Sequence, residues 1–110
     1  MLVDFYEPDG WVIVKFMPVD APTFYKIFGT WRGGYLDGDT WRMSSGSFSP
    51  QDAELHEGVI TWPQTSGSIY KLRVEYENCT TFYTGCVLDN IVERSKANGI
   101  DCELIRFNDT

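Results

Sequence analysis

The sequence predicts an α+β domain in which a single antiparallel sheet of about five or six strands carries one C-terminal helix on a face, followed by a last strand. Three observations lead to this prediction. Short runs of β-branched and aromatic residues recur along the chain, turn residues separate them, and the hydrophobic period becomes helical only in the last third. The length of 110 residues fits a single domain that spans residues 1–110.

The first two predicted strands occupy residues 11–17 and 25–31, which are rich in β-branched and aromatic side chains and are separated by a turn that contains prolines. Asp37 and Gly38 then precede another such run at residues 40–43. Because Asp-Gly between strand-forming residues is a strong hairpin signal, we expect the second and third strands to form a hairpin.

Two further strands are expected at residues 58–62 and 68–75, with a turn at residues 63–67 between them. In the later strand, apolar and charged side chains alternate, as they do in a strand with one buried and one solvated face. The apolar positions of this strand are Tyr70, Leu72 and Val74.

The helix is predicted at residues 80–98, because apolar side chains recur there at helical spacing. Asn98 and Gly99 are typical of a helix C-terminus, and residues 100–107 then form the last strand. We expect the helix to pack its apolar face on the sheet. The expected contacts join Phe82, Cys86, Val87 and Ile91 of the helix to Tyr70, Leu72 and Val74 of the sheet.

The acidic composition restricts the class of partner. Asp and Glu number 16 against 9 Lys and Arg, which gives a formal net charge of -7. Nucleic acids and anionic membranes attract basic surfaces, so we expect neither of them as a partner and favour a protein with a basic surface.

The sequence shows neither a membrane-spanning segment nor a secretory signal, and we expect the protein to lie in the cytoplasm of a host bacterial cell. The apolar runs are far shorter than the roughly 20 residues that cross a bilayer. The first residues carry acids where a secretory signal carries basic residues. The sequence therefore predicts a cytoplasmic protein without membrane contact, as a monomer or a weak homodimer.

The cysteines and the single histidine are the candidates for catalysis. His56 could serve as the base for a cysteine nucleophile. However, Cys79, Cys86 and Cys102 fall on apolar faces of the predicted elements, so we expect buried and unreactive thiols. No Cys-x2-Cys spacing indicates a zinc site. We therefore expect no metal, no cofactor and no enzymatic activity.

Aromatic residues are abundant, with 4 Trp, 6 Tyr and 7 Phe. Aromatic side chains among carboxylates supply contact area and cation–π faces for an arginine-bearing partner. The alternative is that they fill both faces of a twisted sheet. We expect a binding surface made by the hairpin and the loop after it, with the residues Trp31, Tyr35, Asp37, Asp39, Trp41, Arg42, Asp52, Glu54 and Glu57.

Residues 28–46 read Phe-Gly-Thr-Trp-Arg-Gly-Gly-Tyr-Leu-Asp-Gly-Asp-Thr-Trp-Arg-Met-Ser-Ser-Gly. This segment resembles a pattern, approximately G-x-W-x-G-G-Y-x-x-G-D-x-W-R-x-x-S-G, of small uncharacterised proteins from tailed phages and prophages. A second similar element lies at residues 66–71. The resemblance covers half of the chain and names no catalytic residue. It implies a phage origin and an accessory role.

Three functions follow from these observations. The first is a non-enzymatic acidic binding protein of a phage or prophage, which inhibits or modulates a host protein by steric or charge occlusion, as anti-CRISPR, anti-restriction and bacterial immunity proteins do. The second is a small-ligand binding domain or small enzyme that uses the glycine-rich hairpin. The third is a minor virion or assembly protein that associates through a sheet edge.

Overall fold

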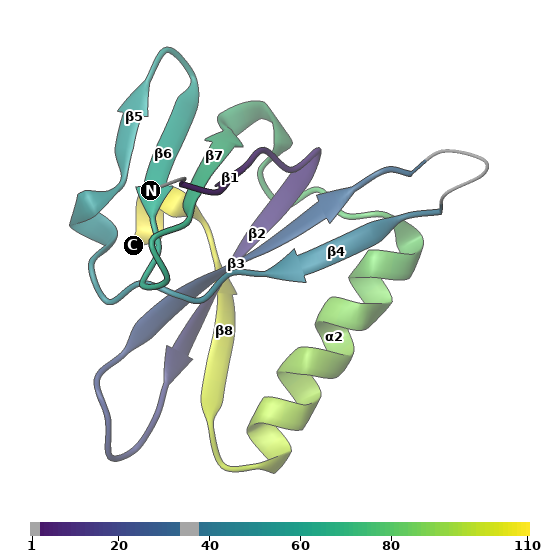
Figure 1. The fold of residues 1–110 in the computed structure, drawn as a ribbon. Helices are drawn as coiled ribbons and strands as arrows, with labels where there is room; N and C mark the ends of the chain where they lie inside the picture. Colours follow the sequence, from purple (N-terminus) through teal and green to yellow (C-terminus); the bar gives the residue numbers. More distant parts are fainter. Residues whose placement is uncertain (1–2, 34–37) are drawn as a thin grey trace.

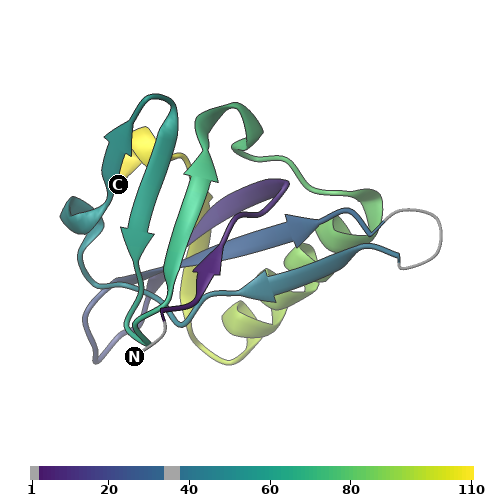
Figure 2. The ribbon, with the colours of Figure 1, turned by 45° about the horizontal axis from the view of Figure 1, so that its top comes forward.

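A computed structural model describes residues 3–33 and 38–110 of the chain and shows three layers (Figures 1 and 2). Two four-stranded sheets pack against each other, and one helix covers the far side of the second sheet. The expectation of a single antiparallel sheet is therefore wrong. The sheet that we call sheet A contains a parallel strand pair, whereas all strand pairs of sheet B are antiparallel.

Sheet B is the middle layer. Its strands, in spatial order, are β4 (Thr40–Met43), β3 (Phe24–Trp31), β2 (Gly10–Met17) and β8 (Asp101–Ile105). These four strands all lie where the sequence predicts them. Successive side chains of β2 point to opposite faces, and both faces are covered, so Trp11 to Val14 are all buried. This run of four buried residues explains why sheet B is central.

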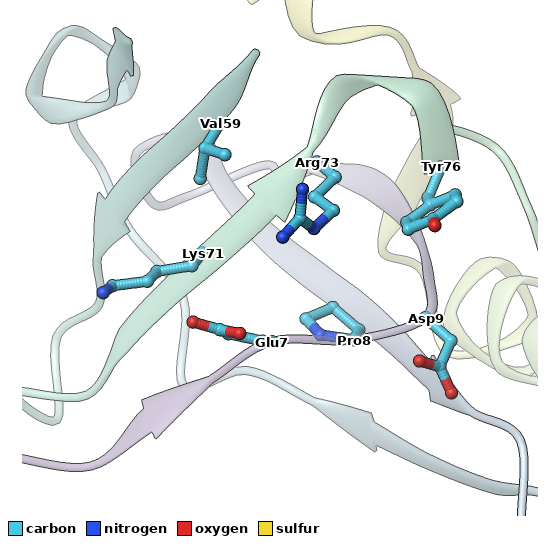
Figure 3. A pocket seen from close by; sticks show the side chains of 7 residues that line it. All are labelled: Glu7, Pro8, Asp9, Val59, Lys71, Arg73 and Tyr76. Carbon is cyan, nitrogen blue, oxygen red and sulfur yellow. The ribbon is translucent and has the colours of Figure 1, made fainter. Parts of the chain in front are cut away.

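Sheet A is an outer layer. Its strands, in spatial order, are β1 (Phe5–Tyr6), β7 (Ile69–Arg73), β6 (Val59–Pro63) and β5 (Glu54–His56). The predictions of β6 and β7 are confirmed, whereas β1 and β5 were not expected because they are only two and three residues long. The outward side chains of β7 include Lys71 and Arg73, which stand on an open face of the molecule (Figure 3).

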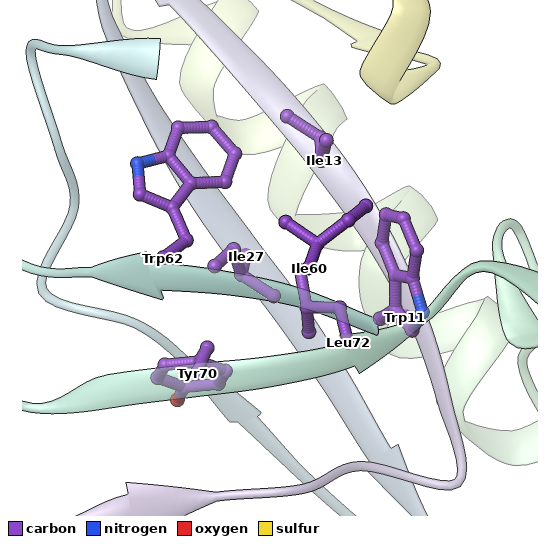
Figure 4. Packing of buried hydrophobic residues seen from close by; sticks show 7 residues of the cluster. All are labelled: Trp11, Ile13, Ile27, Ile60, Trp62, Tyr70 and Leu72. Atoms are coloured by element: carbon purple, nitrogen blue, oxygen red, sulfur yellow. The ribbon is translucent and has the colours of Figure 1, made fainter. Parts of the chain in front are cut away.

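The main core lies between the two sheets (Figure 4). Sheet B contributes the inward side chains of β2 and β3, and sheet A contributes those of β6 and β7. The fully enclosed members are Trp11, Ile13, Ile27, Ile60, Trp62, Tyr70 and Leu72. Trp11 also donates a hydrogen bond from its indole Nε1 to the backbone oxygen of Arg73, at 2.8 Å. This bond links the two sheets where β2 begins and β7 ends.

Helix α2 (Phe82–Ala97) begins and ends close to where the sequence predicts. The side chains of Thr81 and Thr84 each accept a hydrogen bond from the other residue's backbone N–H, which forms a capping box. At the other end Asn98 caps the helix, and Gly99 adopts a positive φ of 84°. No helix in residues 3–33 and 38–110 is long and apolar enough to cross a membrane.

The predicted packing of the helix is only partly right: Val87 and Ile91 pack on the sheet side as expected, but Phe82 and Cys86 do not. Phe82 is 91% exposed and Cys86 is exposed, whereas Leu88 and Thr84 face the sheet. Tyr70 and Leu72 belong to the core between the sheets, and Val74 is exposed. The helix instead forms a second core on the far side of sheet B, with Val12, Val14, Phe16, Phe28, Leu88 and Cys102.

Three short 3-10 helices complete the described chain. They are η1 (Pro50–Asp52) before β5, η2 (Val74–Tyr76) after β7, and η3 (Phe107–Asp109) after β8. The first of these replaces the loop that the sequence predicts there. The second ends the strand predicted at residues 68–75, so the strand is two residues shorter at that end and its last apolar residue leaves the core.

Candidate binding surface

The aromatic residues of the predicted hairpin lie on two opposite faces of sheet B. Trp31 points toward sheet A and makes an edge-to-face contact with Tyr6, with ring centroids 6.4 Å apart. Arg42 points the same way and places its guanidinium 4.5 Å from the centre of the Tyr6 ring. Trp41 lies on the helix side, where it stacks on Phe28. The hairpin therefore does not present these side chains as one surface.

Trp31 and Arg42 close the gap between the sheets. Tyr6 stacks on Tyr70 with ring centroids 5.0 Å apart, so the guanidinium, Tyr6 and Tyr70 form one continuous cluster. Burial raises the pKa of the Tyr70 phenol, and the nearby positive charge of Arg42 acts against this rise. Trp31 is half-buried in this cluster, whereas Arg42 covers the Tyr6 ring from an exposed position.

The acidic residues of the following loop lie elsewhere. Asp52, Glu54 and Glu57 are exposed on or beside η1 and β5. Strand β5 is at the edge of sheet A opposite to β1, and β1 is the strand that meets β4 through Tyr6 and Arg42. Figures 1 and 2 both show β5 and β4 well apart, with other strands of the two sheets between them. The loop acids and the hairpin therefore do not form one surface.

Two predicted site residues, Tyr35 and Asp37, lie outside the described residues. Asp39 is described and is half-buried just before β4. Of the predicted set, Trp41 is the aromatic residue that opens to solvent from the helix side of sheet B, with 39% of its surface exposed.

Trp41 forms part of an apolar groove of about 380 Å³ between α2 and the β3–β4 side of sheet B. We call it the helix–strand groove. Its lining residues are Phe16, Phe24, Lys26, Trp41, Met43, Ile91, Ser95 and Ile100. Helix α2 leaves the outer part of this sheet face only partly covered, with Phe24 and Met43 half-buried and Trp41 39% exposed. Aromatic and aliphatic side chains are consequently left open to solvent.

The groove continues past Phe24 and Lys26 into a second hollow of about 370 Å³. Phe48, which is 58% exposed, borders this hollow and contacts Phe24 edge to face, with ring centroids 6.1 Å apart. Phe24 in turn stacks on Phe16 at 5.0 Å. A row of three phenylalanine rings thus runs from the second core to the surface.

Sequence reasoning missed Phe16, Phe24 and Phe48 as surface-forming residues. Phe24 and Phe16 are directly opposite each other in the β2–β3 register. Because alternate residues of a strand share a face, the sequence could have placed Phe24 on the same face of β3 as Phe28. Only the position of helix α2 shows that this face of sheet B is partly open near Phe24.

A separate hollow of about 400 Å³ lies on the open face of sheet A (Figure 3). Lys71 and Arg73 line it together with the carboxylates Glu7 and Asp9. Asp9 accepts a hydrogen bond from the backbone N–H of Arg32 at 2.8 Å, which gives this carboxylate a structural role. Because the positive and negative charges of the hollow balance, its chemistry does not select one class of ligand.

The candidate catalytic residues are not brought together. His56 lies on β5 at the edge of sheet A, where its side chain is exposed, and Cys102 is enclosed between sheet B and α2. The two residues thus occupy different layers. In the described ranges, no group of three or more His, Cys, Asp or Glu residues is placed to hold a metal ion.

The thiols should differ in reactivity, contrary to the expectation that all three are buried. Cys86 is exposed on α2, whereas Cys102 is buried and desolvation raises the pKa of its thiol. We expect a water-soluble thiol reagent to label Cys86 much faster than Cys102 in the native protein. Mass spectrometry of timed samples measures the two rates. Labelling of Cys102 at a rate equal to that of Cys86 would contradict this assignment.

Comparison of the chain with protein-family models, with curated proteins and with solved structures gives no match.

Proposed function

We propose that this chain is a non-enzymatic binding protein that docks on a partner protein with a basic surface and acts by occlusion. The observation that carries the proposal is the helix–strand groove, an apolar surface with open aromatic side chains on one face of the molecule. Exposed aromatic and aliphatic side chains of this kind are the anchors of protein–protein interfaces.

The net charge supports the choice of partner. A formal charge of -7 on a chain of this size creates a field that attracts a basic surface and repels an acidic one. In such a complex the apolar groove supplies contact area, while the charges set the association rate. The exposed acids Asp52, Glu54 and Glu57 contribute to this field from the far end of sheet A.

The resemblance of residues 28–46 to a phage and prophage pattern leads us to propose a host protein as the partner. A host factor that holds nucleic acid carries lysine and arginine for its phosphates, and an acidic protein can compete for such a site. Covering that site would inhibit the host factor without any chemical step.

The test combines capture of a partner from bacterial lysate with a variant in which one aromatic residue of the groove and one of the second hollow beside it are removed. We expect Trp41→Ala combined with Phe48→Ala to weaken partner binding about 10-fold or more, because each change removes a large exposed aromatic side chain. The dissociation constant of the purified pair measures this effect. Phe82→Ala is the matched control, because Phe82 is an exposed aromatic residue that lines neither the groove nor the second hollow beside it.

The charge part of the proposal has its own readout. Association of wild type should slow as salt increases, because the Debye length falls from about 30 Å at 0.01 M to about 8 Å at 0.15 M.

Unchanged binding in the double variant would rule out the groove as the docking surface. Association rates that do not change with salt would rule out electrostatic steering.

A further inference from the structure

We propose that the helix–strand groove and the second hollow beside it form one binding site for a small amphipathic anion, a monocarboxylate with an aliphatic chain. The chain of the ligand would lie in the groove, and its carboxylate would lie beside the ammonium group of Lys26. This inference goes beyond the proposed function and does not depend on it, because its test needs no partner protein.

Phe24 and Lys26 connect the two hollows. Both side chains line the groove of about 380 Å³, and both also line the second hollow of about 370 Å³. They are alternate residues of β3 and therefore lie on the same face of sheet B. A ligand that extends from one hollow into the other passes an aromatic ring and an ammonium group.

The two hollows differ in polarity. The groove is lined mainly by apolar side chains, including Trp41 and Met43 of β4 and Ile91 of α2. The second hollow adds three hydroxyl-bearing residues, which are Ser45, Ser47 and Thr65. Ligand sites typically combine apolar walls with a few polar groups that fix the orientation of the ligand. This arrangement therefore fits a molecule with an apolar body and one anionic end.

The ammonium group of Lys26 lies where the hollows meet. A Cβ atom added to Gly46 would lie 3.4 Å from Cγ and 3.6 Å from Cε of Lys26, so the half-buried lysine stem packs along the backbone of Gly46. Its Nζ atom is bonded to Cε and is consequently close to Gly46, which lines the second hollow. None of the ion pairs among the described residues involves Lys26. Its charge is therefore available to a ligand.

Ser47 supplies a second polar group. Its residue is 6% exposed, and its Oγ accepts a hydrogen bond from the backbone N–H of Ser49 at 3.0 Å. A hydroxyl can accept and donate at the same time, and the hydrogen bonds among the described residues do not use the hydrogen atom of this hydroxyl. The ammonium and the hydroxyl can both donate to a carboxylate, in hydrogen bonds that are stronger than those between neutral groups.

The local charge and the net charge favour opposite ligands. The formal charge of -7 attracts cations at long range, but at 0.15 M salt this attraction is screened beyond about 8 Å. The described residues that line the two hollows include the cation Lys26 and no carboxylate. A preference of the protein for an anion over a cation of the same shape would therefore have to come from the site itself.

The test measures the binding of octanoate, octanol and octylammonium to the full chain by titration in solution NMR. The three probes share one alkyl chain and differ in the charge of the end group. We expect octanoate to bind about 10-fold more tightly than the other two, because its end group alone pairs with Lys26. Hexanoate should bind more weakly than octanoate, by up to about 4-fold for each methylene that is lost from the groove.

Lys26→Met tests the charge, because methionine keeps an unbranched apolar stem without the ammonium group. We expect octanoate to bind this variant about 10-fold more weakly, with little change for octanol. Lys15→Met is the matched control. Lys15 lies on the neighbouring strand β2 and pairs with Glu103, and its side chain is on the face of sheet B opposite to Phe16 and the groove. Its loss should leave the octanoate affinity nearly unchanged.

The backbone amide signals locate the bound probe. Octanoate should shift the signals of Lys26, Trp41 and Ile91 and leave those of Lys71 and Arg73, which line the hollow on sheet A, unchanged. Shifts confined to Lys71 and Arg73 would assign the anion to that other hollow and overturn the proposal. Failure of wild type to bind octanoate, or equal affinities of wild type for octanoate and octanol, would also overturn it, whether or not Lys26→Met folds.

Discussion

Trp11→Ala is expected to lower the free energy of unfolding by about 3–5 kcal/mol. Trp11 is completely buried between the two sheets, and its indole Nε1 donates a hydrogen bond to the backbone oxygen of Arg73. The alanine variant would lose the apolar contacts of the ring, leave a cavity and deprive that carbonyl of its partner. Urea unfolding followed by circular dichroism measures the change.

Two variants check the cause of this loss. Trp11→Phe retains much of the packing but not the indole N–H, so its destabilisation should be clearly smaller than that of Trp11→Ala. Trp41→Ala removes a tryptophan that is partly exposed and should cost about 1 kcal/mol. Equal stability losses for Trp11→Ala and Trp41→Ala would contradict the placement of Trp11 at the centre of the core.

Leu88→Asp is expected to destabilise the protein by several kcal/mol or to prevent folding, because it puts an unpaired carboxylate into the second core. Leu88 is 3% exposed and packs in the cluster of Val12, Val14 and Phe28. The midpoint of urea unfolding measures the effect. Leu88→Ala, with an expected loss of about 2–5 kcal/mol, provides a measurable value where the aspartate variant does not fold.

Phe82→Asp is the matched control for the orientation of α2. Phe82 is 91% exposed in the first turn of the helix, where a carboxylate interacts favourably with the helix dipole. We expect its stability to equal that of wild type within about 0.5 kcal/mol. If Phe82→Asp were strongly destabilising and Leu88→Asp were tolerated, the result would support the helix orientation that the sequence alone predicts, with Phe82 facing the sheet.

Local patterns in the sequence determined where most of the strands and the helix lie. The strands β2, β3, β4, β6, β7 and β8 and helix α2 all occur close to their predicted positions. Their signals are short-range, such as the alternation in β7 and the Asn98–Gly99 ending of α2. Strands β1 and β5 are only two and three residues long, which is too short for an alternation of apolar and polar side chains to be recognised in the sequence.

The assignment of strands to two sheets depended on contacts between distant parts of the chain. Strand β8 pairs with β2, and β1 pairs with β7, although each pair is far apart in the sequence. Alternation shows that one face of a strand is buried but does not identify what covers it. The continuous apolar run from Trp11 to Val14 is typical of a strand covered on both faces, but the prediction of a single sheet did not make use of it.

The buried face of α2 also depended on tertiary contacts. Apolar residues surround so much of this helix that periodicity is compatible with several orientations, and the sequence-based choice included Phe82 and Cys86. The polar residue Thr84 is instead fully buried, because its Oγ1 contributes to the capping box and hydrogen-bonds to Thr30 at 3.2 Å. Hydropathy alone cannot identify a buried polar side chain whose partner lies in another element.

The candidate surface shows the same division. An excess of aromatic side chains and a net charge of -7 are properties of the sequence, and they predicted a binding protein with Trp41 in its surface. Strand alternation already places Trp41 and Arg42 on opposite faces, and the folded chain adds what each face meets: the groove beside α2 for Trp41, and Tyr6 of sheet A for Trp31 and Arg42. Tertiary structure alone brought Phe24 of β3 and Ile91 of α2 beside Trp41, since a groove forms where layers from distant segments meet without filling the space between them.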